Sequence, residues 1–122
     1  MIVDLDHVQV AAPRGCERQA RRFYGVLLGL AEIVKPAPLQ ARGGVWFEVG
    51  DRQLHIGVAD PFAAASKAHP AFRVESVSEL EALAERLSAA GERVLWDTEL
   101  AAVRRFFTDD PWGNRLELLV RV

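Results

Sequence analysis

The sequence predicts an α+β fold made of two copies of one β-α-β-β-β unit. The first observation is the order strand, helix, strand, strand, strand, which occurs twice within 122 residues. The second is a constant spacing, since the glycines that end the two helices, Gly29 and Gly91, lie 62 residues apart. A repeat of this length fixes the architecture, because one unit alone leaves a face of its sheet open. We therefore expect a single domain, residues 1–122, with modules covering about residues 1–61 and 67–122.

The helices are indicated by apolar residues with the spacing i, i+3, i+4, i+7. The first helix begins at Cys16 and is capped at its end by Gly29. The second is expected to begin at a capping box formed by Ser78 and Glu81, and to end at Gly91. The two apolar stripes are Ala20, Phe23, Tyr24 and Leu27, and Leu80, Leu83, Ala84 and Leu87.

The strands are indicated by alternating polar and apolar residues between turn residues. Gly50 and Asp51 predict a tight hairpin between two of them. Residues 35–44, which include Pro36 and Pro38, are expected to form a loop after a short strand. The predicted strands cover residues 5–11, 30–34, 45–49 and 53–58 in the first module, and residues 69–75, 93–97, 104–108 and 115–121 in the second.

Composition narrows the possible functions. The formal net charge of −2 gives no basic surface for nucleic acid or an anionic membrane. No apolar run approaches the roughly 18 residues of a membrane-spanning helix, and the first residues do not resemble a signal peptide. The single cysteine, Cys16, cannot form an internal disulfide and is expected to pack at the start of the first helix. We predict a cytoplasmic protein.

Three histidines and one glutamate occupy equivalent strand positions in the two modules. His7 and His69 are 62 residues apart, and so are His55 and Glu117. If an approximate two-fold axis relates the modules, these four side chains can converge as ligands of Zn, Ni, Co, Fe or Mn. Against this stands a simpler interpretation, in which each histidine has a structural hydrogen bond and Glu117 pairs with Arg104, Arg105 or Arg115.

Candidates for substrate contact lie on neighbouring strands. Arg104 offers a guanidinium that can hold a carboxylate or phosphate, and Phe106 and Trp46 offer aromatic walls. Alternation also means that either Arg104 or Arg105 points to solvent, and Trp46 can equally serve packing.

Several motifs along the chain occur together in one known family. They are Asp6-His-Val-Gln-Val10, Phe23-Tyr24, Leu28-Gly-Leu30, Phe47-Glu-Val-Gly-Asp51 and, most specifically, Asp110-Pro-Trp-Gly-Asn-Arg-Leu-Glu117. Through them the chain resembles the vicinal oxygen chelate superfamily, which includes glyoxalases, bleomycin-resistance proteins and extradiol dioxygenases. The resemblance implies paired modules whose strands form a cup-shaped or barrel-like mixed sheet with the helices outside and a divalent metal ion at its base. It also implies homodimers.

The resemblance places the metal ligands at His7, His55, His69 and Glu117. His55 departs from glyoxalase I, which commonly has a glutamate there, so Glu117 becomes the candidate catalytic base. We predict a metal-dependent enzyme of the lyase or isomerase type that polarises an oxygen of a small molecule. A dioxygenase is a weaker prediction. The alternatives are a protein that sequesters an antibiotic or other small ligand without catalysis, and a degenerate member that serves as an interaction domain.

Overall fold

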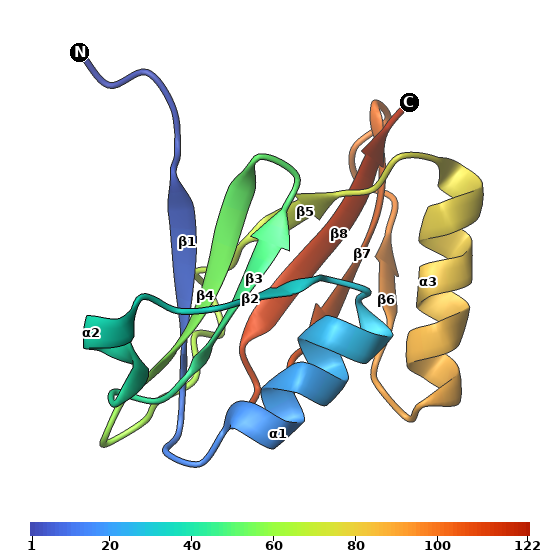
Figure 1. Cartoon of the computed structure of the whole chain (residues 1–122). Helices are drawn as coiled ribbons and strands as arrows, with labels where there is room; N and C mark the ends of the chain where they lie inside the picture. Colours follow the sequence, from blue (N-terminus) through green and yellow to red (C-terminus); the bar gives the residue numbers. More distant parts are fainter. The chain divides into compact units, whose positions relative to one another are not determined.

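The computed structural model describes all 122 residues and divides into two compact units, Met1–Ala64 and Ala65–Val122. Each unit has one four-stranded mixed sheet and a covering helix, which confirms the predicted α+β class with two β-α-β-β-β modules (Figure 1). Neither sheet closes into a barrel. No helix is long and apolar enough to cross a membrane.

The sheet of the first unit has the strand order β1-β4-β3-β2, in which β1 runs parallel to β4 and the other pairs are antiparallel. The segment between β2 and β3, predicted as a loop, contains a short helix, α2. Its sequence tolerates this because Pro36 and Pro38 lie at the N-cap and in the first turn, where a missing N–H costs nothing. The elements are β1 (His7–Ala12), α1 (Glu17–Ala20), η1 (Arg21–Leu27), β2 (Glu32–Ile33), α2 (Ala37–Gln40), β3 (Val45–Val49) and β4 (Arg52–Val58).

The first helix changes its hydrogen bonding partway along. α1 continues directly into η1, a π-helical stretch in which the Leu28 N–H donates to the Phe23 carbonyl at 2.9 Å. Phe23, Tyr24 and Phe47 pack as an aromatic cluster between η1 and the sheet, with ring centroids 5.0 and 6.0 Å apart. Cys16 is confirmed as a buried packing residue, and burial together with the bond from its thiol to Glu17 raises its pKa to about 11.

The second unit repeats the topology, with the order β5-β8-β7-β6 and β5 parallel to β8. Its helix, α3, begins two residues earlier than predicted, because the Ser76 side chain accepts the Glu79 N–H. Both Ser76 and Ser78 have a glutamate three residues later, so the sequence pattern alone does not choose between them. The elements are β5 (Ala71–Arg73), α3 (Val77–Ala89), β6 (Leu95–Asp97), β7 (Val103–Asp109) and β8 (Arg115–Arg121).

The repeat extends to the register of the strands. Gln9 of β1 pairs with His55 of β4, and Ala71 of β5 pairs with Glu117 of β8. Each residue of the second pair lies 62 positions after its counterpart in the first. His55 and Glu117 therefore occupy the same place in their respective sheets.

A hydrogen-bonded turn fixes the start of β8. Asp110 accepts the backbone N–H groups of Trp112 and Asn114 at 3.0 and 2.9 Å, and the Asn114 amide donates to Asp110 at 2.8 Å. Asn114 also accepts the Ala65 N–H at 2.9 Å. Asp110 and Asn114 are buried, so this network holds β8, and Glu117 on it, in a defined position.

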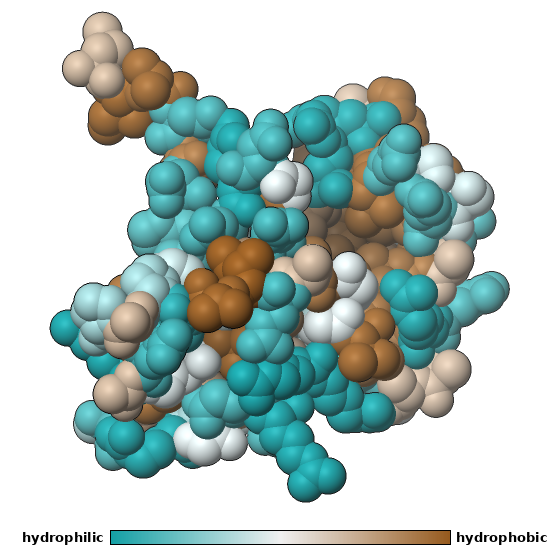
Figure 2. Space-filling view, in the orientation of Figure 1, coloured by the Kyte–Doolittle hydropathy of each residue, from teal (hydrophilic) through white to brown (hydrophobic).

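The N-terminal residues, in contrast, are outside the core. Met1–Val3 are apolar and exposed to solvent (Figure 2).

Candidate functional site

In each unit, strand alternation gives the sheet one apolar face under the helix and one face with polar side chains. Leu54 and Ile56 of β4 are core residues, whereas His55 between them points to the opposite face. The same alternation on β8 places Leu116 and Leu118 in the core and Glu117 on the other side. The predicted ligands thus share the face away from the helix in their own unit.

His55 lies in a stack of three rings. Its ring centroid is 3.6 Å from that of Trp46, with 2° between the planes, and 4.2 Å from that of His7, with 18° between the planes. An imidazole binds a metal through a lone pair in the plane of its ring. Two nearly parallel rings at this separation do not direct their lone pairs at one point. His7 and His55 therefore cannot both bind one ion in this arrangement.

The hydrogen bonds of the two rings differ. The Nδ1 atom of His7 donates to the Asp6 carboxylate at 2.8 Å, so Asp6 holds the Nδ1 proton of this ring. The Nε2 atom of His55 instead donates to the Gln53 side-chain oxygen at 2.9 Å. Burial, reinforced by the neighbouring His7, lowers the pKa of His55 and keeps this ring neutral. His55 therefore acts as a fixed aromatic spacer between Trp46 and His7.

The second unit joins His69 to Glu117. Nε2 of His69 lies 3.1 Å from Oε1 of Glu117, and Nδ1 of the same ring lies 2.9 Å from the Lys67 carbonyl oxygen. A carbonyl oxygen only accepts hydrogen bonds, so Nδ1 carries a proton and donates to Lys67. With a second proton on Nε2 the ring forms an ion pair with Glu117. Without that proton the Nε2 lone pair faces the carboxylate oxygen, and a metal cation can lie between the two atoms.

Arg105 holds the other oxygen of the Glu117 carboxylate. Its guanidinium donates to Glu117 Oε2 at 3.3 Å and to Asp97 Oδ2 at 2.6 and 3.1 Å. Burial opposes the charge of Arg105, but these two carboxylates raise its pKa. The hydrogen bond from the Glu99 N–H lowers the pKa of Asp97, and the Arg105 guanidinium lowers it further. Arg105 thus lies between the carboxylates of Glu117 and Asp97 and pairs with both.

No group of three His, Cys, Asp or Glu side chains that could hold a metal ion is formed within either unit. The donor chemistry of the His69–Glu117 pair nevertheless fits a divalent ion. Its carboxylate is buried, and the backbone carbonyl of Lys67 fixes the metal-binding tautomer of His69. His7 has the corresponding arrangement, with Asp6 holding its Nδ1 atom.

Two of the residues predicted to contact substrate lie away from the face that carries Glu117. Phe106 is fully buried in the core beneath α3, and Arg104 pairs with Glu81 of that helix at 2.9 Å while its guanidinium covers Trp96. Arg105, one position later, is the residue of this strand that reaches Glu117.

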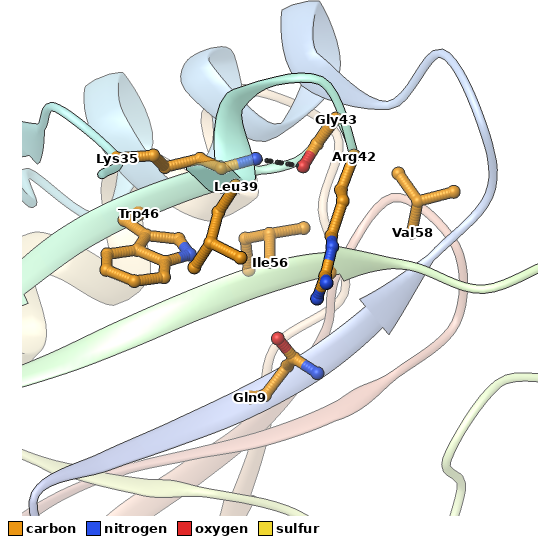
Figure 3. A pocket seen from close by; sticks show the side chains of 9 residues that line it. Gln9, Lys35, Leu39, Arg42, Gly43, Trp46, Ile56 and Val58 are labelled. Carbon is orange, nitrogen blue, oxygen red and sulfur yellow. Dashed lines mark hydrogen bonds between the residues drawn. The ribbon is translucent and has the colours of Figure 1, made fainter. Parts of the chain in front are cut away.

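Trp46, in contrast, lines a pocket of about 200 Å³ in the first unit (Figure 3). The pocket lies between the polar face of β1, β3 and β4 and the segment around α2. Two cations within eight residues, Lys35 and Arg42, mark this segment in the sequence as a possible pocket wall, but the prediction of a loop does not give its conformation. The lining residues are Gln9, Lys35, Leu39, Arg42, Gly43, Trp46, Ile56, Gly57 and Val58.

Comparison with known families places the chain in a defined class. Residues 5–118 match the model of the Glyoxalase/Bleomycin resistance protein/Dioxygenase superfamily, and the chain belongs to this superfamily. Its members commonly bind divalent metal ions and are typically homodimers that bind small molecules. The match confirms the predicted family resemblance.

Among solved structures, the chain is similar to a protein of Bacillus anthracis that is described as belonging to the glyoxalase family. The two share 45% identity over 100% of this chain and 98% of the other, with a TM-score of 0.93. The fosfomycin resistance protein FosX from Listeria monocytogenes shares the fold at 18% identity, with a TM-score of 0.79 and coverage of 100% and 96%. Lactoylglutathione lyase from Agrobacterium tumefaciens does so at 18% identity, with a TM-score of 0.75 and coverage of 96% and 92%. The comparison with curated proteins found no match.

Proposed function

We propose that the protein is a metal-dependent enzyme of the lyase or isomerase type that acts on a small oxygen-bearing molecule. The observation that carries this proposal is the contact between His69 Nε2 and Glu117 Oε1 at 3.1 Å, with the His69 proton held on Nδ1 by Lys67. Metal-binding histidines commonly donate their second N–H to a carbonyl or carboxylate in this way. A divalent ion held there acts as a Lewis acid toward a substrate oxygen.

We propose His69 and Glu117 as metal ligands in the second unit, and His7, at the position equivalent to His69, as a metal ligand in the first. Imidazole and carboxylate ligands suit a catalytic divalent ion, and a small number of protein ligands leaves coordination positions open. His55 is left out because its ring is parallel to that of His7 and its Nε2 atom is engaged by Gln53. Its proposed role is to hold the His7 ring in place. The homodimeric state of family members is also proposed for this chain.

Arg105 and Asp97 are proposed to position the carboxylate of Glu117. Both Glu117 oxygens have partners, His69 on one side and Arg105 on the other, and the side chain is 8% exposed. This arrangement supports a ligand role for Glu117. Its predicted role as catalytic base requires a free oxygen, which the carboxylate gains only when one of these contacts is released.

The test is the metal content of the protein purified without chelator, together with activity of the loaded protein. We expect about one divalent ion per chain in the wild type and loss of that ion in His69→Gln, Glu117→Gln and His7→Gln. Glu85→Gln, an equal charge change at an exposed position of α3, and His55→Phe are expected to retain it. The first activity probes are the hemithioacetal of methylglyoxal with glutathione, and fosfomycin, chosen from the two structural neighbours.

A second candidate is a protein that sequesters a small ligand without catalysis. The observation that favours it is the pocket in the first unit, which has an aromatic wall at Trp46 and needs no metal ion. A chain that retains no divalent ion from any of the tested metals, yet binds small molecules in this pocket, supports sequestration. Stoichiometric metal lost on substitution of His69 or Glu117 supports the enzyme.

A further inference from the structure

The pocket in the first unit is positively charged, although the chain as a whole is acidic. Lys35 and Arg42 are among its lining residues, and no aspartate or glutamate is. The formal net charge of the whole chain is −2. The local excess of positive charge attracts an anion into this one place.

Arg42 has no carboxylate partner, unlike Arg21, Arg104 and Arg105, which are ion-paired with Glu32, Glu81 and Asp97. Figure 3 shows its guanidinium directed into the pocket toward the side-chain amide of Gln9, which belongs to β1. The guanidinium and the amide thus face the same space from different elements, with the amide oxygen of Gln9 on the side nearer Arg42. A ligand that carries acceptor oxygens can bind the guanidinium in bidentate fashion.

The backbone keeps room for the Gln9 amide. A Cβ atom placed on Gly57 would lie 2.7 Å from both Cδ and Oε1 of Gln9. Glycine at this position therefore lets the amide lie close against β4, where it lines the pocket. An alanine would displace only the end of a flexible side chain, so it tests the amide position without disturbing the strand.

The segment that carries Arg42 is tied down at several points. The Lys35 ammonium donates to the Gly43 carbonyl, and the Gln40 amide donates to the Lys35 carbonyl at 3.0 Å. The Gly44 N–H donates to the Glu17 carboxylate at 2.8 Å, a bond that lowers the pKa of Glu17. Arg42 is therefore presented from a segment that is already held before ligand binds, which reduces the entropy lost on binding.

The opposite side of the pocket is apolar and adjoins the histidines. Leu39, Ile56 and Trp46 line it, and the Trp46 ring stacks on His55 at 3.6 Å. The volume of about 200 Å³ is below the ~300–1,000 Å³ typical of sites for drug-sized ligands. The pocket therefore suits a small molecule with one anionic group and a short apolar or aromatic body.

We propose that this pocket binds the carboxylate or phosphate group of a small organic anion, with Arg42 as the anion contact, the Gln9 amide beside it and Trp46 against the apolar body. This binding site goes beyond the proposed function, because none of its lining residues is a proposed metal ligand.

The test is a calorimetric or NMR titration of the full chain after treatment with EDTA, using phenyl phosphate, benzoate and neutral benzamide. We expect both anions to bind at the Gln9 and Trp46 resonances, and benzamide to bind at least about tenfold more weakly. Phenyl phosphate binding tighter than benzoate assigns a phosphate group, and the reverse order assigns a carboxylate. Benzamide binding as tightly as the anions overturns the proposal.

Matched variants locate the site. Arg42→Gln is expected to weaken anion binding about tenfold or more, whereas Arg22→Gln, the same change at an exposed position of η1, leaves it unchanged. Gly57→Ala is expected to weaken it by displacing the Gln9 amide. Unchanged binding in Arg42→Gln overturns the proposal. Since the protein is metal-free here, this result does not depend on the metal analysis, and either proposal can fail while the other holds.

Discussion

Nε2 of His69 lies 3.1 Å from Oε1 of Glu117, while the Nδ1 proton of the same ring is held by the Lys67 carbonyl. In the metal-free protein this contact is an ion pair when Nε2 is protonated, and a metal cation can take the place of that proton. An amide donor at position 69 keeps a hydrogen bond to Glu117 but offers no imidazole nitrogen to a metal ion.

The first prediction concerns His69→Gln. The glutamine amide can donate to Glu117, so the metal-free variant is expected to be about as stable as the metal-free wild type. A divalent ion at about 100 times its Kd should add about 2.7 kcal/mol to the wild type, raising its Tm by several degrees. The variant should show no such rise. Thermal unfolding with and without added zinc measures both, and an equal rise in the two proteins contradicts the metal role of His69.

The second prediction is a loss of stability in mild acid caused by His55. Burial and His7 lower its pKa in the folded state, so the unfolded chain takes up this proton first. The free energy of unfolding should therefore fall as pH drops below about 6.5, the ordinary pKa of histidine. His55→Phe keeps a stacked ring without the titration. Urea unfolding across this range should give a shallower pH dependence for the variant, and an unchanged dependence would count against the assignment.

The third prediction concerns a glycine that supports the pocket segment. Gly44 has φ +88°, and a Cβ atom there would lie 2.1 Å from the Ile56 carbonyl oxygen. Gly44→Ala is expected to reduce the free energy of unfolding by at least about 2 kcal/mol. Gly50→Ala is the matched control, since Gly50 has φ +56° with open space around it and should cost only about 1 kcal/mol. Chemical denaturation compares them, and equal losses would show that the close approach to Ile56 is not limiting.

The fourth prediction is a stabilising substitution. The hydroxyl of Thr108 is buried in β7 without a hydrogen-bond partner. Thr108→Val has the same shape and removes the unsatisfied group, so it should raise the free energy of unfolding by about 1 kcal/mol. Thr98→Val, at an exposed position, is expected to change it by less than about 0.5 kcal/mol. A destabilised Thr108→Val would indicate that the hydroxyl is bonded to a buried water molecule.

Much of the fold could be predicted because the repeated pattern is local. Alternation along β8 identified Glu117 as the polar residue between buried Leu116 and Leu118, and the register of β5 and β8 bears this out. The start of a helix was harder to predict where two capping sequences lie close together. Ser76 and Ser78 both begin a Ser-x-x-Glu sequence, and the helix uses the first.

Within the site, the ambiguity lies between adjacent residues. Arg104 and Arg105 are neighbours in the sequence, so alternation alone allows either on the polar face, and only the pairing of Arg105 with Leu119 places it there. His55 was predicted as a ligand because it lies 62 residues before Glu117 and because the family resemblance places a ligand there. The parallel rings, 4.2 Å apart, show that neighbouring residues need not share a ligand.

The sequence by itself determined the doubled β-α-β-β-β architecture and the polar residues at equivalent points of its two halves, because strand alternation and helix caps act between near neighbours. Only the tertiary structure decided what those residues do. Which nitrogen of His69 holds its proton, which ring His55 covers and which arginine reaches Glu117 depend on contacts between strands. These contacts are set by register and packing, and a linear pattern does not contain them.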